Sequence, residues 1–278
     1  FRHIFPMYLS ILIVATSFLL ISSLQVKSQE NYEVRQIRFN GNKTLEEEFL
    51  LERLAIKEVS WLEKVVTKNE PFLYNEELVE LDLERLVRIY QSEGFLQAKA
   101  SLLPPKIDED KETMKLIIQV EERNPMIVDS VSIRFPNDLG NVDTDSLQKR
   151  IFRNLELVPK ERFRDDDLET DIQTIEDALK SMGFAYVNTS YDLDLDFDNF
   201  TTGIYYTIMS GPKTYFGATT ISGNKNVSTP FIKKQLSYEE GKLYDKSALN
   251  ETRQDLYRLQ LFRVVSVLTK KNEDDKAS

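Results

Sequence analysis

Carboxylates are the side chains of this sequence that offer the most chemistry, and two of their runs could suggest a binding site. The first run, Asp192-Leu-Asp-Leu-Asp-Phe-Asp198, has an aspartate at every second residue, so its carboxylates share one face of an extended strand. Carboxylates bind calcium, but the run lacks the glycine and the final glutamate of an EF-hand loop. A solvated strand face is therefore the favoured interpretation, and a weak cation site is the alternative. The second run, Asp165-Asp166-Asp167, is typical of a helix N-terminus, where the dipole favours negative charge.

Composition excludes most other catalytic chemistry. The chain has no cysteine, which removes thiol nucleophiles, thiolate metal ligands and disulfides. Its single histidine, His3, lies in the N-terminal segment, so the rest can form neither a histidine triad nor a histidine zinc site. The sequence has no phosphate-binding glycine loop and no nucleophile elbow. We therefore expect a protein that is not an enzyme and has no catalytic, cofactor-binding or metal-binding residues. A glycosidase-like carboxylate pair is the only enzymatic alternative.

The charge balance bears on the kind of partner. The formal net charge is -10 and the sequence pI is about 4.9. Such a surface repels nucleic-acid phosphates and anionic lipid headgroups. We therefore expect no nucleic-acid partner.

Residues 1–28 have the pattern of a signal peptide. A basic residue precedes the apolar run Met7–Leu24, and Val26-Lys-Ser28 suits cleavage after Ser28. Cleavage there would yield an exported chain. The alternative is an uncleaved membrane anchor, although the run is at the lower length limit for a span and contains polar residues.

Three segments of the chain repeat one order of signals. The first opens with an alternating strand and a Gly41-Asn42 turn, and the third opens with a similar phrase, Tyr215-Phe-Gly-Ala-Thr-Thr-Ile-Ser-Gly-Asn224. The middle segment has the strand, within Met126–Phe135, but a different turn. A short helix is expected after each turn. Thr44, with Glu47 three residues later, has the spacing of a capping box for the first of these helices.

A second, longer helix in each segment gives the strongest evidence for repetition. In the first two segments apolar residues recur at steps of four, three and four, which places them on one helical face. Tyr74 and Phe163 are 89 residues apart. The same offset superimposes the apolar residues of the first helix, and the residues that flank it, on those of the second. The stripes are Val79, Leu83, Leu86 and Tyr90, and Leu168, Ile172, Ile175 and Leu179; each is followed by a Gly-Phe pair, Gly94-Phe95 or Gly183-Phe184.

Two further strands are expected after the glycine of each segment, so the full repeat is β-α-α-β-β. This order predicts an α+β fold of tandem modules, each a small sheet covered by two helices. The predicted modules are residues 29–124, 125–211 and 212–278, after the signal peptide. The third is incomplete: its strand Leu261–Leu268 is followed by a charged tail, and its last strand is missing.

On these residues the chain resembles the POTRA repeats of the BamA/TamA family of outer-membrane protein assembly factors, as an N-terminal part without the barrel. The most specific carriers are Ile221-Ser-Gly-Asn-Lys225, Glu240-Gly-Lys-Leu-Tyr-Asp245 and Leu256-Tyr-Arg-Leu-Gln-Leu-Phe-Arg-Val264. Gln260 stands where the family usually has glycine. The resemblance implies modules on the periplasmic face of the bacterial outer membrane, ahead of a transmembrane barrel. It implies as partners unfolded outer-membrane proteins and accessory envelope subunits.

In that family the strand after the second helix often serves as a binding edge. An unpaired edge offers backbone donors and acceptors to any extended chain, which gives affinity with little sequence preference. The alternative is that these residues only face their own helices, as in any half-buried strand. The resemblance implies as partner-binding residues Phe95, Leu96, Gln97 and Ala98 in the first module, and Ala185, Tyr186, Val187 and Asn188 in the second.

Two other kinds of POTRA-bearing protein stay open as alternatives. One is a two-partner secretion transporter. The other is an inner-membrane-anchored periplasmic protein that retains Met7–Leu24.

Overall fold

The computed structural model describes residues 32–58 and 72–271, so the predicted signal peptide lies outside the described residues. The chain divides into two compact units, one of residues up to 88 with 98–122, and one of 89–97 with 123–278. Within the described ranges no helix has the length and apolar character needed to cross a membrane. The module boundaries at residues 124 and 211 stay predictions.

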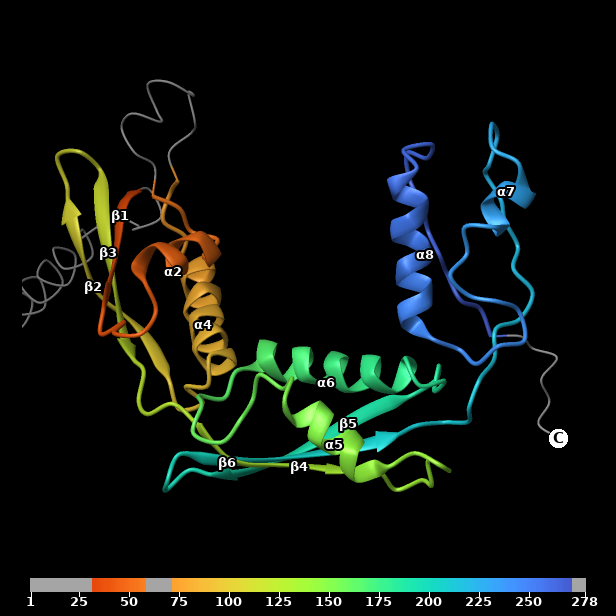
Figure 1. Cartoon of the computed structure of the whole chain (residues 1–278). Coiled ribbons are helices and arrows are strands. Elements are labelled where there is room, and N and C mark those ends of the chain that lie inside the picture. Colours follow the sequence, from red (N-terminus) through yellow and green to blue (C-terminus); the bar gives the residue numbers. More distant parts are fainter. Residues whose placement is uncertain (1–31, 59–71, 272–278) are drawn as a thin grey trace, which may run out of the picture. The chain divides into compact units, whose positions relative to one another are not determined.

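The first module has the predicted order of elements (Figure 1). Strand β1 (Glu33–Asn40) leads through α2 (Glu47–Arg53) to the long helix α4 (Glu76–Ser92), and β2 (Lys99–Asp108) and β3 (Thr113–Glu121) follow as a hairpin. The sheet order is β1-β3-β2, with β3 parallel to β1 and antiparallel to β2. The last strand along the chain is therefore the central strand.

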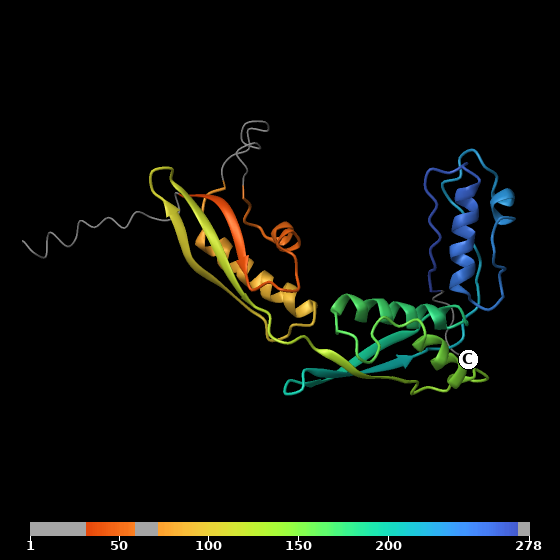
Figure 2. The same ribbon diagram turned by 60° about the vertical axis from the view of Figure 1, so that its left-hand side comes forward.

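The second module repeats this topology (Figure 2). Its elements are β4 (Ile127–Arg134), α5 (Thr144–Phe152), α6 (Asp165–Lys180), β5 (Asn188–Asp196) and β6 (Thr201–Met209). The sheet order is β4-β6-β5, again with the last strand in the centre. Residues of both helices pack in the same apolar cluster as the buried residues of β6, so both helices cover the same face of the sheet. The predicted α+β fold is confirmed for these two modules.

Strand alternation decides which sheet face is buried. In β6, Ile204, Tyr206 and Ile208 are buried, whereas Tyr205 and Met209 on the opposite face are exposed. The buried face packs on α5 and α6 and forms one apolar cluster, which includes Leu147, Ile175 and Leu179. The opposite face is therefore left open to solvent.

The predicted capping box at Thr44 is wrong. Helix α2 begins at Glu47, with Glu46 as N-cap and no side-chain cap. Thr44 instead donates its backbone N–H and its hydroxyl to the carboxylate of Glu122, at 2.8 and 2.9 Å. The side chain of Glu47 pairs with Arg38 of β1. Both side chains are thus used to hold the turn after β1 against the sheet, and none is left for the local cap.

The third module has helices but no sheet among its described residues. Helices α7 (Thr229–Lys233) and α8 (Lys246–Arg258) form, and Tyr215 makes only an isolated bridge to Leu243. The strands predicted near Tyr215 and at residues 261–268 are therefore wrong for the described chain. In the first two modules the outer strands pair only through the central last strand. The third module has no such strand among its described residues, so its outer segments have no central strand to pair with there.

Candidate strand-binding site

The free edges of the two sheets differ in how much backbone they offer. The edge strands are β1, β2, β4 and β5, since β3 and β6 are paired on both sides. Strands β1 and β4 are partly covered by their own loops. The N–H of Val34 donates to the carbonyl of Phe72 at 2.8 Å, and the N–H of Val128 donates to the carbonyl of Glu161 at 2.9 Å. These two edges are therefore closed at their beginnings.

Two prolines interrupt the edge strand β2. Pro104 and Pro105 have no N–H, and the pairing of β2 with β3 shifts between Leu103 and Lys106. Prolines and irregularities on an edge limit pairing with a foreign strand. The uninterrupted part of β2 ends at Leu103.

Strand β5 offers the longest regular edge of the described sheets. Its pairing with β6 runs from Asn188 to Asp196 without a register shift. The N–H of Thr189 donates to the carboxylate of Glu176 on α6 at 3.1 Å, so it points away from β6. In an antiparallel pair every second residue directs its N–H and C=O outward. Tyr191, Leu193 and Leu195 therefore present their backbone groups to solvent.

The two faces of β5 have opposite character. Leu193 and Leu195 pack partly against the apolar core under the helices. Asp192, Asp194 and Asp196 lie on the other face, where they oppose residues of β6 that face away from the helices. All three aspartates are exposed, as the alternation in the sequence predicts.

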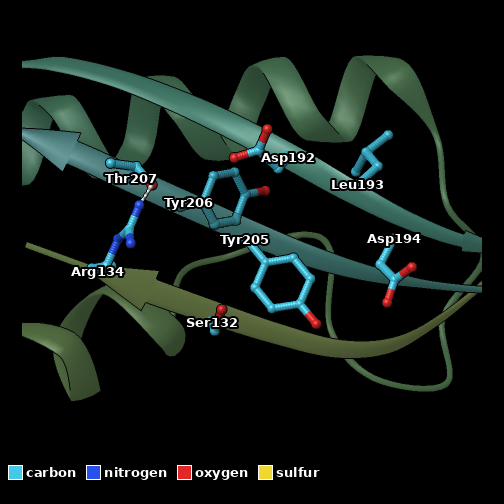
Figure 3. Close-up of a pocket in the computed structure, with 8 residues that line it drawn as sticks. All are labelled: Ser132, Arg134, Asp192, Leu193, Asp194, Tyr205, Tyr206 and Thr207. Atoms are coloured by element: carbon cyan, nitrogen blue, oxygen red, sulfur yellow. Dashed lines mark hydrogen bonds between the residues drawn. The ribbon is translucent and has the colours of Figure 1, made fainter.

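The acidic face borders a shallow open hollow of about 450 Å³ (Figure 3). The ring of Tyr205 lies at its centre and is 44% exposed. The one cation that lines the hollow is Arg134, whose guanidinium donates to the hydroxyl of Thr207 at 3.3 Å. The lining residues are Ser132, Arg134, Asp192, Leu193, Asp194, Tyr205, Tyr206 and Thr207.

The acidic row differs in how its carboxylates are used. Asp196 accepts hydrogen bonds from the Asn199 side chain at 2.7 Å and from the backbone N–H groups of Asp198 and Asn199, which lowers its pKa below the usual range. Among the described residues, no side chain forms a hydrogen bond or ion pair with Asp192 or Asp194. These two charges are therefore available to a partner.

A buried aspartate fixes helix α6, which carries Glu176 to the β5 edge. Asp171 is fully buried and accepts from the N–H groups of Glu156 and Leu157, at 2.6 and 3.1 Å. The hydroxyl of Tyr206 on the central strand donates to it at 3.1 Å. Burial raises the pKa of Asp171, against the effect of these donors. The Asp171 carboxylate thus connects three parts of the module: the loop after α5, helix α6 itself and the central strand β6.

The eight predicted partner-binding residues lie almost entirely before the edge strands. Strand β2 begins at Lys99 and β5 at Asn188, so Asn188 alone of the predicted residues lies within a strand. Phe95, Ala98 and Val187 are buried, Leu96 and Ala185 are half-buried, and Gln97, Tyr186 and Asn188 are exposed. Their role in partner binding stays a prediction. The outward N–H of Thr189 is bonded to Glu176, so the outward N–H groups of β5 that stay open begin at Tyr191, just before the alternating run of aspartates.

Metal binding has no geometric support in this part of the chain. Within residues 32–58 and 72–271, no group of three or more histidine, cysteine, aspartate or glutamate side chains is arranged to hold a metal ion. Asp165, Asp166 and Asp167 occupy the first turn of α6. The chemistry that the site offers is backbone pairing beside two available carboxylates.

Known proteins resemble the chain along most of its length. A family model described as POTRA, surface antigen variable number repeat, matches residues 32–123, 132–211 and 214–277. The outer membrane protein assembly factor BamA of Neisseria meningitidis serogroup B is 22% identical over 242 residues, which cover 86% of this chain and 29% of that protein. The protein of the same name from Neorickettsia risticii is 23% identical over 242 residues, covering 87% and 31%. The chain thus spans less than a third of the length of these relatives.

A solved structure shares the fold. The crystal structure of Haemophilus influenzae BamA POTRA3-5 has a TM-score of 0.54 and 20% sequence identity, and the match covers 84% of this chain and 88% of that one.

Proposed function

Since the chain belongs to the POTRA family of surface antigen variable number repeats, we propose that it is the periplasmic scaffold arm of an outer-membrane protein assembly factor. The arm binds unfolded barrel proteins, or accessory envelope subunits, by strand addition. This role requires export, a position on the periplasmic face of the outer membrane and attachment to a membrane barrel. It requires neither catalysis nor a cofactor.

The observation that supports strand addition is the regular, outward-facing edge of β5. Three residues there, Tyr191, Leu193 and Leu195, have backbone groups that no sheet neighbour uses. Strand addition gives affinity through main-chain hydrogen bonds, so it suits a receptor for many different clients. Unfolded barrel proteins supply such clients because their strands alternate apolar and polar residues.

A site-specific crosslink tests this mode. A photoreactive residue is placed at Ser190 on the open edge strand β5, and in a matched variant at Ser130 on β4, whose edge is partly covered. We expect a urea-unfolded barrel protein to crosslink at position 190 and not at 130, and the folded barrel protein to crosslink at neither. Equal crosslinking at both positions, or none, overturns strand addition at β5.

Envelope fractionation tests the assembly-factor role. An antibody against residues 29–278 identifies the native protein, whose mass is compared on gels with and without boiling. A product well above 32.4 kDa that shifts on heating is expected, because a folded barrel keeps its compact form until it is boiled. A product of about that mass without a heat shift contradicts the barrel attachment.

A further inference from the structure

We propose that the β5 edge selects extended segments that alternate basic and apolar residues. This inference rests on strand addition as the proposed function and adds a specificity to it. The occupant is a strand with lysine or arginine on the face away from the helices and apolar residues on the helix side.

The backbone fixes where such a strand lies. The outward N–H of Thr189 is already bonded to Glu176, so pairing begins at Tyr191 and continues to Leu195. No proline and no register shift interrupts this stretch. An added strand therefore continues the sheet in a defined register, with its side chains alternating between the two faces of the module.

The face away from the helices supplies charge complementarity. Asp192 and Asp194 are exposed and two residues apart, so they lie on the same face of β5. Side chains directly opposite on neighbouring strands approach to about 5 Å, close enough for opposite charges to attract and like charges to repel. Arg134 is the single cation lining this hollow, and its guanidinium already donates to Thr207.

The helix side of the edge supplies apolar contacts. Leu193 and Leu195 pack partly against the core, and Tyr191 beside them is 45% exposed. Apolar residues of an added strand cover these side chains and are removed from water. Charge on one face and apolar surface on the other set the alternating pattern.

The uninterrupted part of the other hairpin edge, Lys99 to Leu103, has no carboxylate. The corresponding face of β2 carries Lys99, Ser101 and Leu103, and Pro104 interrupts the edge beyond them. Selection of basic strands is therefore a property of β5 and not of every edge in the chain.

Peptide binding to the full chain measures the selection. Three fluorescent peptides alternate valine with lysine, with glutamine or with glutamate, and a fourth is the lysine peptide with N-methylated backbone. We expect the lysine peptide to bind at least about tenfold more tightly than the glutamate peptide at low salt, with the glutamine peptide between them. The N-methylated peptide is expected not to bind, since it cannot pair with the edge.

Charge variants place the selection at the edge. D192N/D194N is expected to bring the lysine and glutamate peptides to nearly equal affinity. E239Q/E240Q removes the same charge from two exposed residues of the third module, outside β5, and is expected to keep the tenfold ratio. A ratio that survives D192N/D194N, or that E239Q/E240Q also removes, overturns the inference.

The outcomes of these experiments distinguish the selection of basic strands from strand addition itself. If all alternating peptides bind equally while the N-methylated one does not, strand addition stands and the selection is overturned. If no peptide binds, both are overturned.

Discussion

One helical position carries a buried oxygen acceptor in each of the three modules. Asp82, Asp171 and Thr252 each lie eight residues after the aromatic that precedes the second helix, and all are buried. Asp82 accepts from the N–H groups of Ala55 and Ile56, as Asp171 does from its own loop, and the Thr252 hydroxyl accepts from Ser237. The acceptor satisfies the backbone that leaves the first helix, which would otherwise be buried without partners.

Replacing Asp171 with asparagine tests this role. The introduced side-chain amide would turn a donor toward N–H groups that need an acceptor, so one buried bond is lost and a donor is left unpaired. We expect D171N to lower the free energy of unfolding of the second module by about 2–4 kcal/mol. Urea unfolding measures the loss. D166N, on an exposed residue in the first turn of the same helix, removes only a charge that the helix dipole favours and is expected to cost less than about 1 kcal/mol; equal losses in both variants contradict the acceptor role.

Tyr206 predicts a difference in alkaline stability. Its pKa lies well above the usual value, because the ring is buried and because the Asp171 carboxylate lies beside the hydroxyl that donates to it. Above about pH 10 the unfolded chain loses the phenolic proton while the folded module keeps it, so stability present below that pH is lost as pH rises. Between about pH 10 and 11 we expect the wild type to lose about 1 kcal/mol more than Y206F.

The exposed neighbour Tyr205 supplies the control for this measurement. Urea unfolding is followed at about pH 9, 10 and 11 for the wild type, Y206F and Y205F. The Y205F variant keeps the buried hydroxyl, so its alkaline loss should match that of the wild type. An unchanged pH slope in Y206F contradicts the role of the buried phenol.

At the scale of elements, the Gly-Asn turn has different consequences in the first and third modules. Gly41 has φ +86°, and a Cβ built there would lie 2.2 Å from the carbonyl oxygen of Val120 in β3. Gly223 has nearly the same conformation, φ +79°, but no atom lies within 4 Å of its Cβ position. The turn of the first module therefore needs glycine both for its backbone conformation and for its approach to the central strand.

Alanine at these two positions separates the two requirements. G223A carries only the cost of a left-handed conformation, about 1 kcal/mol, whereas G41A adds a backbone clash and is expected to cost about 2–4 kcal/mol. Hydrogen exchange of the amides in β3 measures the loss at Gly41, and exchange in α8 serves for Gly223. Equal losses of stability in G41A and G223A would mean that the close approach of Gly41 to β3 adds no cost of its own.

The periodicity of apolar residues predicts the helices and strands of this chain better than it predicts which strands form the edges of the sheets. The offset from Tyr74 to Phe163 identifies both long helices and carries Asp82 onto Asp171, although the polar member is hidden within an apolar stripe. Strand order is not readable from alternation, because an edge strand and a central strand can both be half-buried. Phe95 and Ala98 are apolar, as the residues of a half-buried strand would be. They lie instead in the turn that precedes β2. The predicted partner-binding residues therefore lie mostly ahead of the strands whose edges are free.

At the scale of the whole molecule, each sheet depends on the strand that comes last. In the first two modules the final strand separates the two outer strands and pairs with each of them. The third module keeps the same helices and a buried Tyr244, but Leu261, Val264 and Leu268 are exposed at 55, 75 and 89%. The helices thus form from local interactions, whereas the sheet forms only when the central strand, which is distant in sequence from the first strand, pairs with both outer strands.

Shortening the chain after Phe200 removes β6 and tests this dependence. Without β6, the outer strands β4 and β5 have no neighbouring strand, so the amides that they donate to β6 should exchange as fast as those of residues 217–222 do in the longer chain. The first sheet, which retains β3, should keep its protection and serves as the internal control. Hydrogen exchange read by mass spectrometry distinguishes the outcomes. Protected amides in β5 would mean that the edge forms without the central strand, and then the unpaired segments of the third module would need a different explanation.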